Sequence, residues 1–328
     1  MVKMYLRYSK LVLLIFVFSC HSVEKQKDEF VPSFSFDKPD GFPPMIYPQN
    51  PDLSQAIVSL GKELFKDSLL HINEEFACVS CHIPQKSFTS PELRNDFAVM
   101  PLINMGWDIH FLWFGDISGT LEDAMLFEIE EFFKTDMIRL NQDHYYQEKF
   151  EEAFGKTTIT TRDLANAMAH YLRTVTAGNS RFDKFTRGEV NLTDAEYRGY
   201  ELFFSERGDC FHCHGTVFFK DNEFHNNGLN EVFEGNDRGR YLVTGDSMDL
   251  GKFKTPTLRN IALTAPYMHD NRYATLKEVL DFYSDSVNFT PFTDPLMNHE
   301  GGINMTEQEK ADLLSFLYTL TDSTVFEK

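Results

Sequence analysis

The stretch Cys210-Phe211-His212-Cys213-His214 is a C-x-x-C-H sequence, and a second one, Cys78-Val79-Ser80-Cys81-His82, lies upstream. Two thiols at this spacing can bond to the two vinyl groups of one porphyrin, and the adjacent histidine then becomes the proximal ligand of the iron. Similar flanks precede the two copies, Gly61-Lys62-Glu63-Leu64-Phe65 and Gly199-Tyr200-Glu201-Leu202-Phe203, which indicates a duplicated unit. A single copy could instead be half of a zinc site or a chance match. The duplication instead predicts two covalently bound haem c groups, attached at Cys78, Cys81, Cys210 and Cys213, with His82 and His214 as iron ligands.

The length and charge of the chain limit the classes of protein to which it can belong. With 328 residues, of which 42% are hydrophobic, the chain is long enough for two packed domains, one for each haem. The net charge of −19 argues against a nucleic-acid partner, because phosphate binding needs a basic surface. The same charge favours solubility and a basic redox partner.

Residues 1–20 have the features of a bacterial export signal. Basic residues precede the apolar run Leu11–Phe18, and Ser19-Cys20 follows it. The run is too short for a permanent membrane-spanning helix. Its end resembles a lipobox, where a cysteine is lipidated and becomes the first residue of the mature protein. The pattern predicts a lipid anchor on Cys20 at the periplasmic side of a bacterial membrane.

Helix signals dominate the rest of the chain. Capping signals begin at Thr160, Thr193, Thr275 and Thr306, and strand signals are sparse. Apolar periodicity predicts further helices over Leu53–Phe65 and Leu121–Phe133, while 91–120 and 220–251 are expected to be mostly loop. We therefore predict a mainly α fold with two cytochrome-c-like haem domains in tandem. The predicted organisation is a lipoprotein signal peptide (1–20), a tether (21–50), an N-terminal haem c domain (51–190) and a C-terminal haem c domain (191–328).

Residues 251–270 read GKFKTPTLRNIALTAPYMHD, and Phe224-His225-Asn226-Asn227-Gly228-Leu229 lies before them. With Cys213-His214-Gly215, these runs resemble the bacterial dihaem cytochrome c peroxidases and their relative MauG. The resemblance extends over 52–321. It implies that the N-terminal haem is the peroxide site and that the C-terminal haem relays electrons to it.

The resemblance also implies residues that act beside the haems. Aligning 276–283 with the family puts Tyr283 at the sixth ligand of the C-terminal iron, a position that is Met in many peroxidases and Tyr in MauG. A phenolate stabilises ferric iron, whereas Met raises its potential, so Tyr283 favours MauG-like chemistry. An ordinary buried tyrosine is the alternative, with Met268 as the substitute ligand. Trp113 is implied as the electron bridge between the haems, and Trp107 is expected to be structural.

The distal side of the peroxide site departs from the family. The family's glutamine falls on Ala124, and its glutamate falls on Lys134, or on Asp136 if two residues are inserted. Cleavage of peroxide needs a positioned carboxylate, so Asp136 is our predicted catalytic acid–base. The alternatives are Glu128, Glu130 and Glu131. Because the amide is missing, the expected activity is weak.

Two further positions bear on the metal sites. The asparagine of the family's calcium site falls on Ala98, so calcium is expected only if Asn95 replaces it after a local shift. His71, seven residues before Cys78, is expected to be a surface histidine. If it instead capped the first haem, it would close the peroxide site.

These observations lead to one function and two alternatives. The leading hypothesis is a lipid-anchored periplasmic dihaem oxidoreductase that reduces hydrogen peroxide with electrons from a small redox protein such as a cytochrome c. The first alternative is a dihaem electron-transfer protein without peroxidase activity. The second is a MauG-like oxidase of a partner protein. The sequence is compatible with a monomer and with a dimer.

Overall fold

The computed structural model describes residues 35–36, 38–49, 53–297 and 301–327, which belong to one compact unit, Ser33–Lys328. The predicted signal peptide, with Cys20, lies outside the described residues. Within these ranges, no helix is long and apolar enough to cross a membrane. The predicted domain boundary between residues 190 and 191 therefore lies inside this unit.

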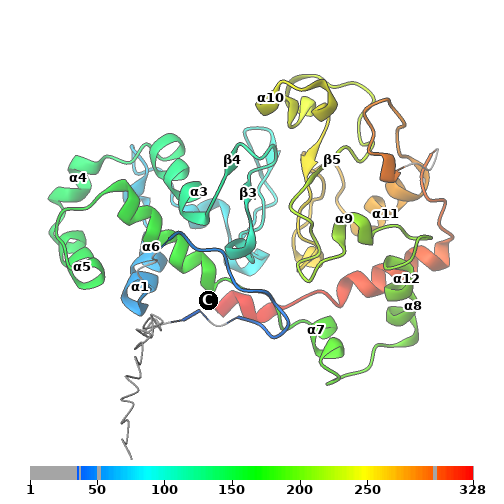
Figure 1. The fold of residues 1–328 in the computed structure, drawn as a ribbon, viewed down its shortest axis with the longest axis horizontal. Helices are drawn as coiled ribbons and strands as arrows, with labels where there is room; N and C mark the ends of the chain where they lie inside the picture. The colour runs from blue at the N-terminus through cyan, green and yellow to red at the C-terminus, as the bar shows by residue number, and fades with distance from the viewer. Residues whose placement is uncertain (1–34, 37, 50–52, 298–300, 328) are drawn as a thin grey trace, which may run out of the picture. The chain divides into compact units, whose positions relative to one another are not determined.

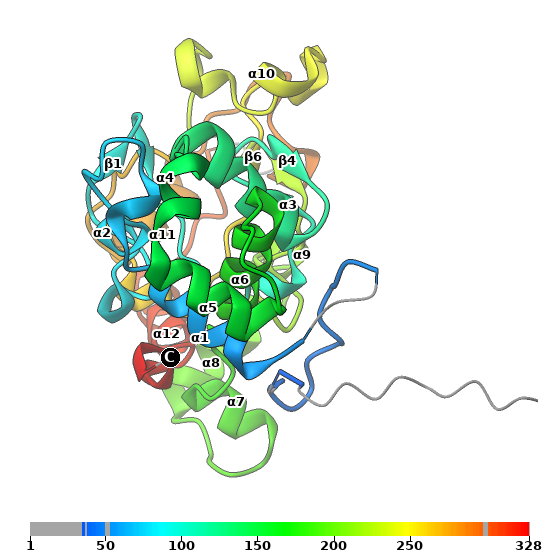
Figure 2. The same ribbon diagram turned by 90° about the vertical axis from the view of Figure 1, so that its left-hand side faces the viewer.

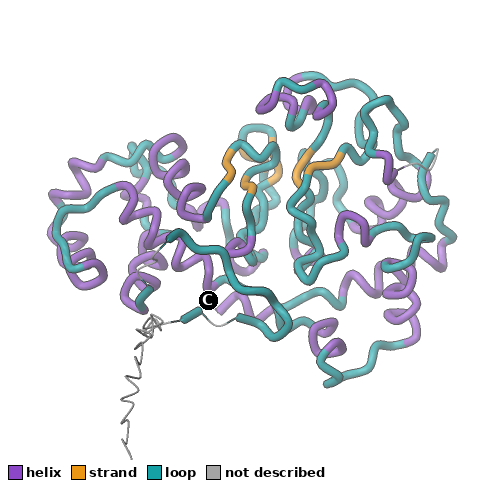
Figure 3. The backbone as a smooth tube through the Cα atoms, viewed as in Figure 1, coloured by secondary structure: helices purple, strands orange, loops and turns teal. Residues whose placement is uncertain are grey.

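Helices carry the fold, as Figure 3 shows in purple, and the mainly helical class predicted from the sequence is confirmed. In the part of the chain that the structure describes, six strands of two residues each form three antiparallel pairs. The helices are α1 (Gln55–Leu64), α2 (Cys78–Cys81), α3 (Leu121–Phe127), α4 (Met137–Gln142), α5 (His144–Phe154), α6 (Thr161–Thr174), α7 (Arg181–Thr186), α8 (Asp194–Phe203), α9 (Phe211–His214), α10 (Tyr241–Thr244), α11 (Leu276–Asp285) and α12 (Glu307–Tyr318). The strands are β1 (Leu93–Arg94), β2 (Phe97–Ala98), β3 (His110–Phe111), β4 (Ile117–Ser118), β5 (Phe224–His225) and β6 (Phe253–Lys254).

The predicted capping signals begin helices. In α6, α8, α11 and α12 a threonine at the N-cap accepts a hydrogen bond from the backbone of the third helical residue, whose acidic side chain accepts one in return. These reciprocal bonds satisfy backbone N–H groups that the first turn of a helix leaves without partners. The four predicted starts are confirmed.

The repeated flanks of the two C-x-x-C-H sequences have the same role in helix packing. A Cβ on Gly61 of α1 would lie 1.9 Å from the carbonyl oxygen of Ala167 in α6, and a Cβ on Gly199 of α8 would lie 2.0 Å from that of Asp312 in α12. Only glycine permits such close helix contacts. Each flank therefore places a helix against its partner, α1 on α6 (Figure 2) and α8 on α12.

Two large hydrophobic clusters follow the two repeats. The first draws mainly on α1, α3, α5 and α6, with Val325 from the end of the chain. The second begins at Phe182 and includes α8, α11 and α12. Because Phe182 precedes 190, the second cluster starts before the predicted domain boundary.

Part of the predicted tether packs on the body of the protein. Phe36, Phe42 and Met45 are buried in a cluster with Trp107 and Phe218. Figure 1 shows this segment in dark blue, passing between the two groups of helices. The described part of 21–50 is therefore a strap that joins both groups, because Trp107 and Phe218 come from different halves of the chain.

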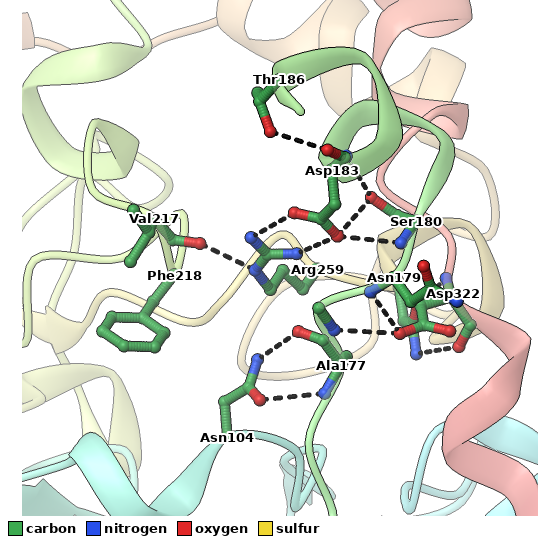
Figure 4. Close-up of polar contacts among 12 residues, drawn as sticks. Asn104, Ala177, Asn179, Ser180, Asp183, Thr186, Val217, Phe218, Arg259 and Asp322 are labelled. Atoms are coloured by element: carbon green, nitrogen blue, oxygen red, sulfur yellow. Dashed lines mark hydrogen bonds and ion pairs between the residues drawn. The ribbon is translucent and has the colours of Figure 1, made fainter. Parts of the chain in front are cut away.

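The connection from α6 to α7 is held by polar side chains from distant segments (Figure 4). Asn104 exchanges two hydrogen bonds with the backbone of Ala177, at 2.9 and 3.0 Å. Asp322 accepts from the backbone N–H groups of 178 and 179 at 2.9 and 2.8 Å. Asp183 forms a bidentate pair with Arg259, with both distances 2.9 Å.

Candidate functional site

The first C-x-x-C-H sequence opens into a cavity of about 460 Å³. Cys78, Cys81 and His82 form one wall, and Trp113 and Glu128 lie among the other lining residues. The lining is mostly apolar, as a porphyrin requires.

The second C-x-x-C-H sequence lines a cavity of about 240 Å³. Cys210, Cys213 and His214 form its wall, together with Met268 and Tyr283. The four cysteines of the two cavities carry free thiols. Burial raises the pKa of the Cys210 thiol to about 12 and also raises that of Cys78, so these thiols are neutral in the absence of haem.

The two histidines are oriented in the same way. The Nδ1 atom of His82 lies 2.9 Å from the carbonyl oxygen of Phe88, and that of His214 lies 2.7 Å from the carbonyl oxygen of Phe219. Donation from Nδ1 leaves Nε2 as the nitrogen for iron and fixes the ring, as in other metal-ligating histidines. Burial lowers the pKa of His82 to about 4 and lowers that of His214, which keeps both rings in the neutral form that binds metal. The residues present therefore fit a haem in each cavity.

A cluster of possible metal ligands lies at the second cavity. The ligating atoms of Cys213, Asp221 and His225 lie within 4.8 Å of one another. Burial alone would lower the pKa of His225, but hydrogen bonds to Asp221 (2.8 Å) and Asp294 (2.6 Å) raise it to about 12. Both ring nitrogens of His225 are therefore engaged by carboxylates of the protein itself.

Trp113 lines both cavities. Its Nε1 atom donates to the carbonyl oxygen of Ala98 at 2.8 Å, and its own carbonyl oxygen accepts from the N–H of Lys254 at 2.9 Å. The indole is therefore fixed in the wall that the cavities share. Trp107 lines neither of the two and donates to the carbonyl oxygen of Pro43 at 2.9 Å inside the strap cluster.

Tyr283, on α11, reaches the second cavity together with His214. Its hydroxyl accepts a hydrogen bond from the Asn227 side chain at 3.0 Å. Burial raises the pKa of Tyr283 to about 12, so the phenol is neutral in the absence of iron. Met268 lines the same cavity. The two residues predicted as alternative ligands of the C-terminal iron, Tyr283 and Met268, therefore both lie at the second cavity.

The carboxylates of the first cavity differ from the predicted set. Asp136 is not brought to the cavity; its side chain accepts from the backbone N–H groups of 138 and 139, at 3.0 and 3.1 Å, and begins α4. Glu128 and Glu131 line the cavity instead. The predicted helix over 121–133 ends as α at Phe127 and continues as the π-helical turn η4 (Glu128–Phe132). The helical path ends at Phe133, Lys134 has a φ of 52°, and Asp136 then caps the new helix α4, so a count of residues from Ala124 does not bring Asp136 to the cavity.

Glu128 is the candidate acid–base group that the structure favours. Burial raises the pKa of its carboxyl to about 7. A carboxyl of this pKa can both take and return a proton near neutral pH. Glu130 points elsewhere and accepts from the Thr161 hydroxyl at 2.8 Å.

Known proteins resemble the chain over most of its length. The family model of the di-haem cytochrome c peroxidases matches residues 55–191. The methylamine utilization protein MauG of Methylorubrum extorquens is 32% identical in an alignment of 303 positions that covers 87% of this chain and 83% of that protein. The chain belongs to the dihaem cytochrome c peroxidase and MauG family.

Two further relatives extend the comparison within the dihaem cytochrome c peroxidase and MauG family. The cytochrome c551 peroxidase of Nitrosomonas europaea is 29% identical over 72% of this chain and 74% of that protein. A crystal structure of a MauG-like protein associated with microbial copper homeostasis has a TM-score of 0.83 at 32% identity, covering 89% of this chain and 97% of that one. The shared fold therefore extends over both cavities.

At the asparagine position of the family's calcium site, Ala98 brings no side-chain oxygen, and the predicted substitute Asn95 lines the first cavity. Calcium takes six to eight oxygen ligands. Ala98 offers only its backbone, and its carbonyl oxygen already accepts from Trp113. The neighbouring wall presents the ammonium groups of Lys220 and Lys254, which repel a divalent cation.

The prediction that His71 lies at the surface is wrong. The residue is buried, with its ring centroid 4.1 Å from that of Phe76 and its Nδ1 atom accepting from the N–H of Glu75 at 3.3 Å. It does not line the first cavity. Nothing in its position closes the peroxide site.

Proposed function

We propose that this chain is a dihaem c-type oxidoreductase that reduces hydrogen peroxide in the first cavity with electrons relayed from the second. The observation that carries the proposal is the repeated arrangement of two C-x-x-C-H cavities that share Trp113. Membership of the dihaem cytochrome c peroxidase and MauG family supports it. Haem supplies the redox-active iron.

The side chains divide the remaining tasks. His82 and His214 hold the irons and are oriented by backbone carbonyl groups. Glu128 takes a proton from one oxygen of peroxide and returns it to the leaving oxygen. Trp113 lies on the route for electrons between the cavities. The net charge of −19 supports a small redox protein with a basic surface, such as a cytochrome c, as donor.

A turnover assay tests this function. The chain is matured in a periplasm, mass spectrometry counts the haem additions, and peroxide is then added with a reduced cytochrome c. Two haem additions and peroxide-dependent oxidation of the donor are expected. A dihaem protein without any reaction with peroxide would leave electron transfer as its function.

A MauG-like oxidation of a partner protein is the second candidate function, and Tyr283 in the second cavity favours it. As the sixth ligand of that iron, a phenolate would stabilise its ferric state. We expect Tyr283→Phe to change the ferric absorption spectrum and to raise the potential of this haem, because an anionic ligand is lost. Tyr267→Phe is the matched control, since Tyr267 lines the same cavity but donates to the carbonyl oxygen of Ile261 at 3.0 Å. An unaltered spectrum in Tyr283→Phe would transfer the ligand role to Met268.

The protein is further proposed to be a periplasmic lipoprotein. The support is the basic and apolar start of the sequence with Ser19-Cys20. We expect Cys20→Ala to move the protein from the membrane fraction to the soluble fraction after cell fractionation, because a lipid chain provides the anchor. Ser19→Ala, which keeps the cysteine, is the control. Retention of Cys20→Ala in the membrane fraction would contradict the lipid anchor.

A further inference from the structure

Three charged side chains are buried together in the wall between the cavities. Those of Asp108, Lys220 and Lys254 are 4%, 2% and 3% exposed. Lys220 Nζ forms an ion pair with Asp108, and Lys254 Nζ lies 3.4 Å from the second oxygen of the same carboxylate. Two ammonium groups thus share one carboxylate, which leaves a net positive charge in a buried place.

The cluster faces the places where the haems are expected. All three residues line the first cavity, and Lys254 also lines the second, as Trp113 does. Lys254 is fixed there by β6, which pairs with β5, and by its backbone bond to Trp113. Lys254 is therefore a cation common to both cavities.

The charge of the cluster is not balanced by its own members. Removing an ion from water costs several kcal/mol unless an opposite charge compensates it. Burial lowers the pKa of Lys220 to about 8 even though the charge of Asp108 opposes the shift.

We propose that Lys220 and Lys254 bind the propionate carboxylates of the haems, Lys220 in the first cavity and Lys254 at the edge of both. This inference rests on the proposed dihaem function. An anionic carboxylate supplies the charge that the cluster lacks, and ammonium-to-carboxylate hydrogen bonds are among the strong ones in proteins. The pair of lysines fixes the haem edges beside Trp113 and stabilises the reduced irons, because a nearby positive charge favours the state with one more electron.

The reduction potentials of the two haems test the proposal. Lys254→Met removes the shared charge and is expected to lower both potentials, with a shift of about tenfold in the ferric-to-ferrous ratio, equivalent to about 59 mV for a one-electron couple. Lys220→Met is expected to lower only the potential of the first haem. Lys252→Met is the matched control, because Lys252 lies two residues from Lys254, pairs with Asp249 at 3.2 Å and lines neither cavity. Wild-type potentials in both cavity variants would overturn the proposal.

A second measurement covers the case in which the methionine variants do not fold. Lys220→Arg and Lys254→Arg keep the charge but replace an ammonium by a guanidinium, so the propionate bending bands in resonance Raman spectra are expected to move. Unmoved bands in both arginine variants would overturn the proposal as well. Neither measurement depends on turnover. A dihaem chain that shows these shifts but does not reduce peroxide would therefore contradict the proposed function alone.

Discussion

Replacing Glu128 by Gln is expected to lower peroxide turnover by about 10²–10⁴-fold, the usual contribution of a general acid–base group, while the haem content stays unchanged. Glu128 lines the cavity of His82, and burial raises the pKa of its carboxyl to about 7. The ionised carboxylate must accept the first proton of peroxide. Turnover in the wild type is therefore expected to fall as the pH drops through about 7, and this dependence should vanish in the variant.

Steady-state kinetics with a reduced cytochrome c measure both effects. Glu130→Gln is the matched control, because Glu130 lies in the same turn but bonds to Thr161 outside the cavity. Its turnover should equal that of the wild type. Wild-type turnover in Glu128→Gln would rule this residue out, and Glu131, the other carboxylate of the lining, would then be replaced.

Replacing Arg259 by Met is expected to lower the free energy of unfolding by about 3–5 kcal/mol, because it leaves the buried Asp183 carboxylate without its partner. Arg259 is 2% exposed and makes a bidentate pair with Asp183. Its Nε atom also donates to the carbonyl oxygen of Val217 at 2.7 Å. Whole proteins are stable by only about 5–15 kcal/mol, so the loss should be obvious in urea denaturation.

Arg181→Met provides the comparison. Arg181 makes a similar bidentate pair with Glu196, at 2.9 and 3.0 Å, but the two side chains are 41% and 16% exposed. Exposed pairs contribute little, so this variant should unfold near the wild-type midpoint. Equal losses in the two variants would show that burial is not what makes the Arg259 pair important.

The Arg259 pair also predicts how stability depends on pH. Burial alone would raise the pKa of Asp183, but the hydrogen bonds and charge of Arg259 outweigh burial and hold it below the ordinary value of 3.8. A carboxyl whose pKa is lower in the folded state stabilises the protein above the unfolded pKa. The contribution is present at neutral pH and is lost as the pH falls below about 3.8 toward the folded value. Acid titration of the Arg259→Met variant should show a smaller loss, because only the hydrogen bonds from Ser180 to Asp183 remain.

Some features of this protein were determined by short stretches of sequence. The two C-x-x-C-H sequences predict the haem sites, because covalent attachment would depend only on residues at most four apart. The four capping boxes begin their helices through bonds within one turn. The mainly helical class follows from the same local signals. Each of these features is settled by neighbours along the chain.

Other features were decided only by the tertiary structure. Glu128 reaches the cavity one helical turn after Ala124, whereas Asp136 lies at the start of α4, because side-chain direction depends on the path of the backbone and not on a count of residues. The strap around Phe42 and Met45 is polar and proline-rich in sequence, and its few apolar side chains are buried only because Trp107 and Phe218 meet there. The cluster of Asp108, Lys220 and Lys254 joins residues up to 146 positions apart. Charges so distant along the chain interact only after folding, so no local pattern in the sequence predicts their interaction.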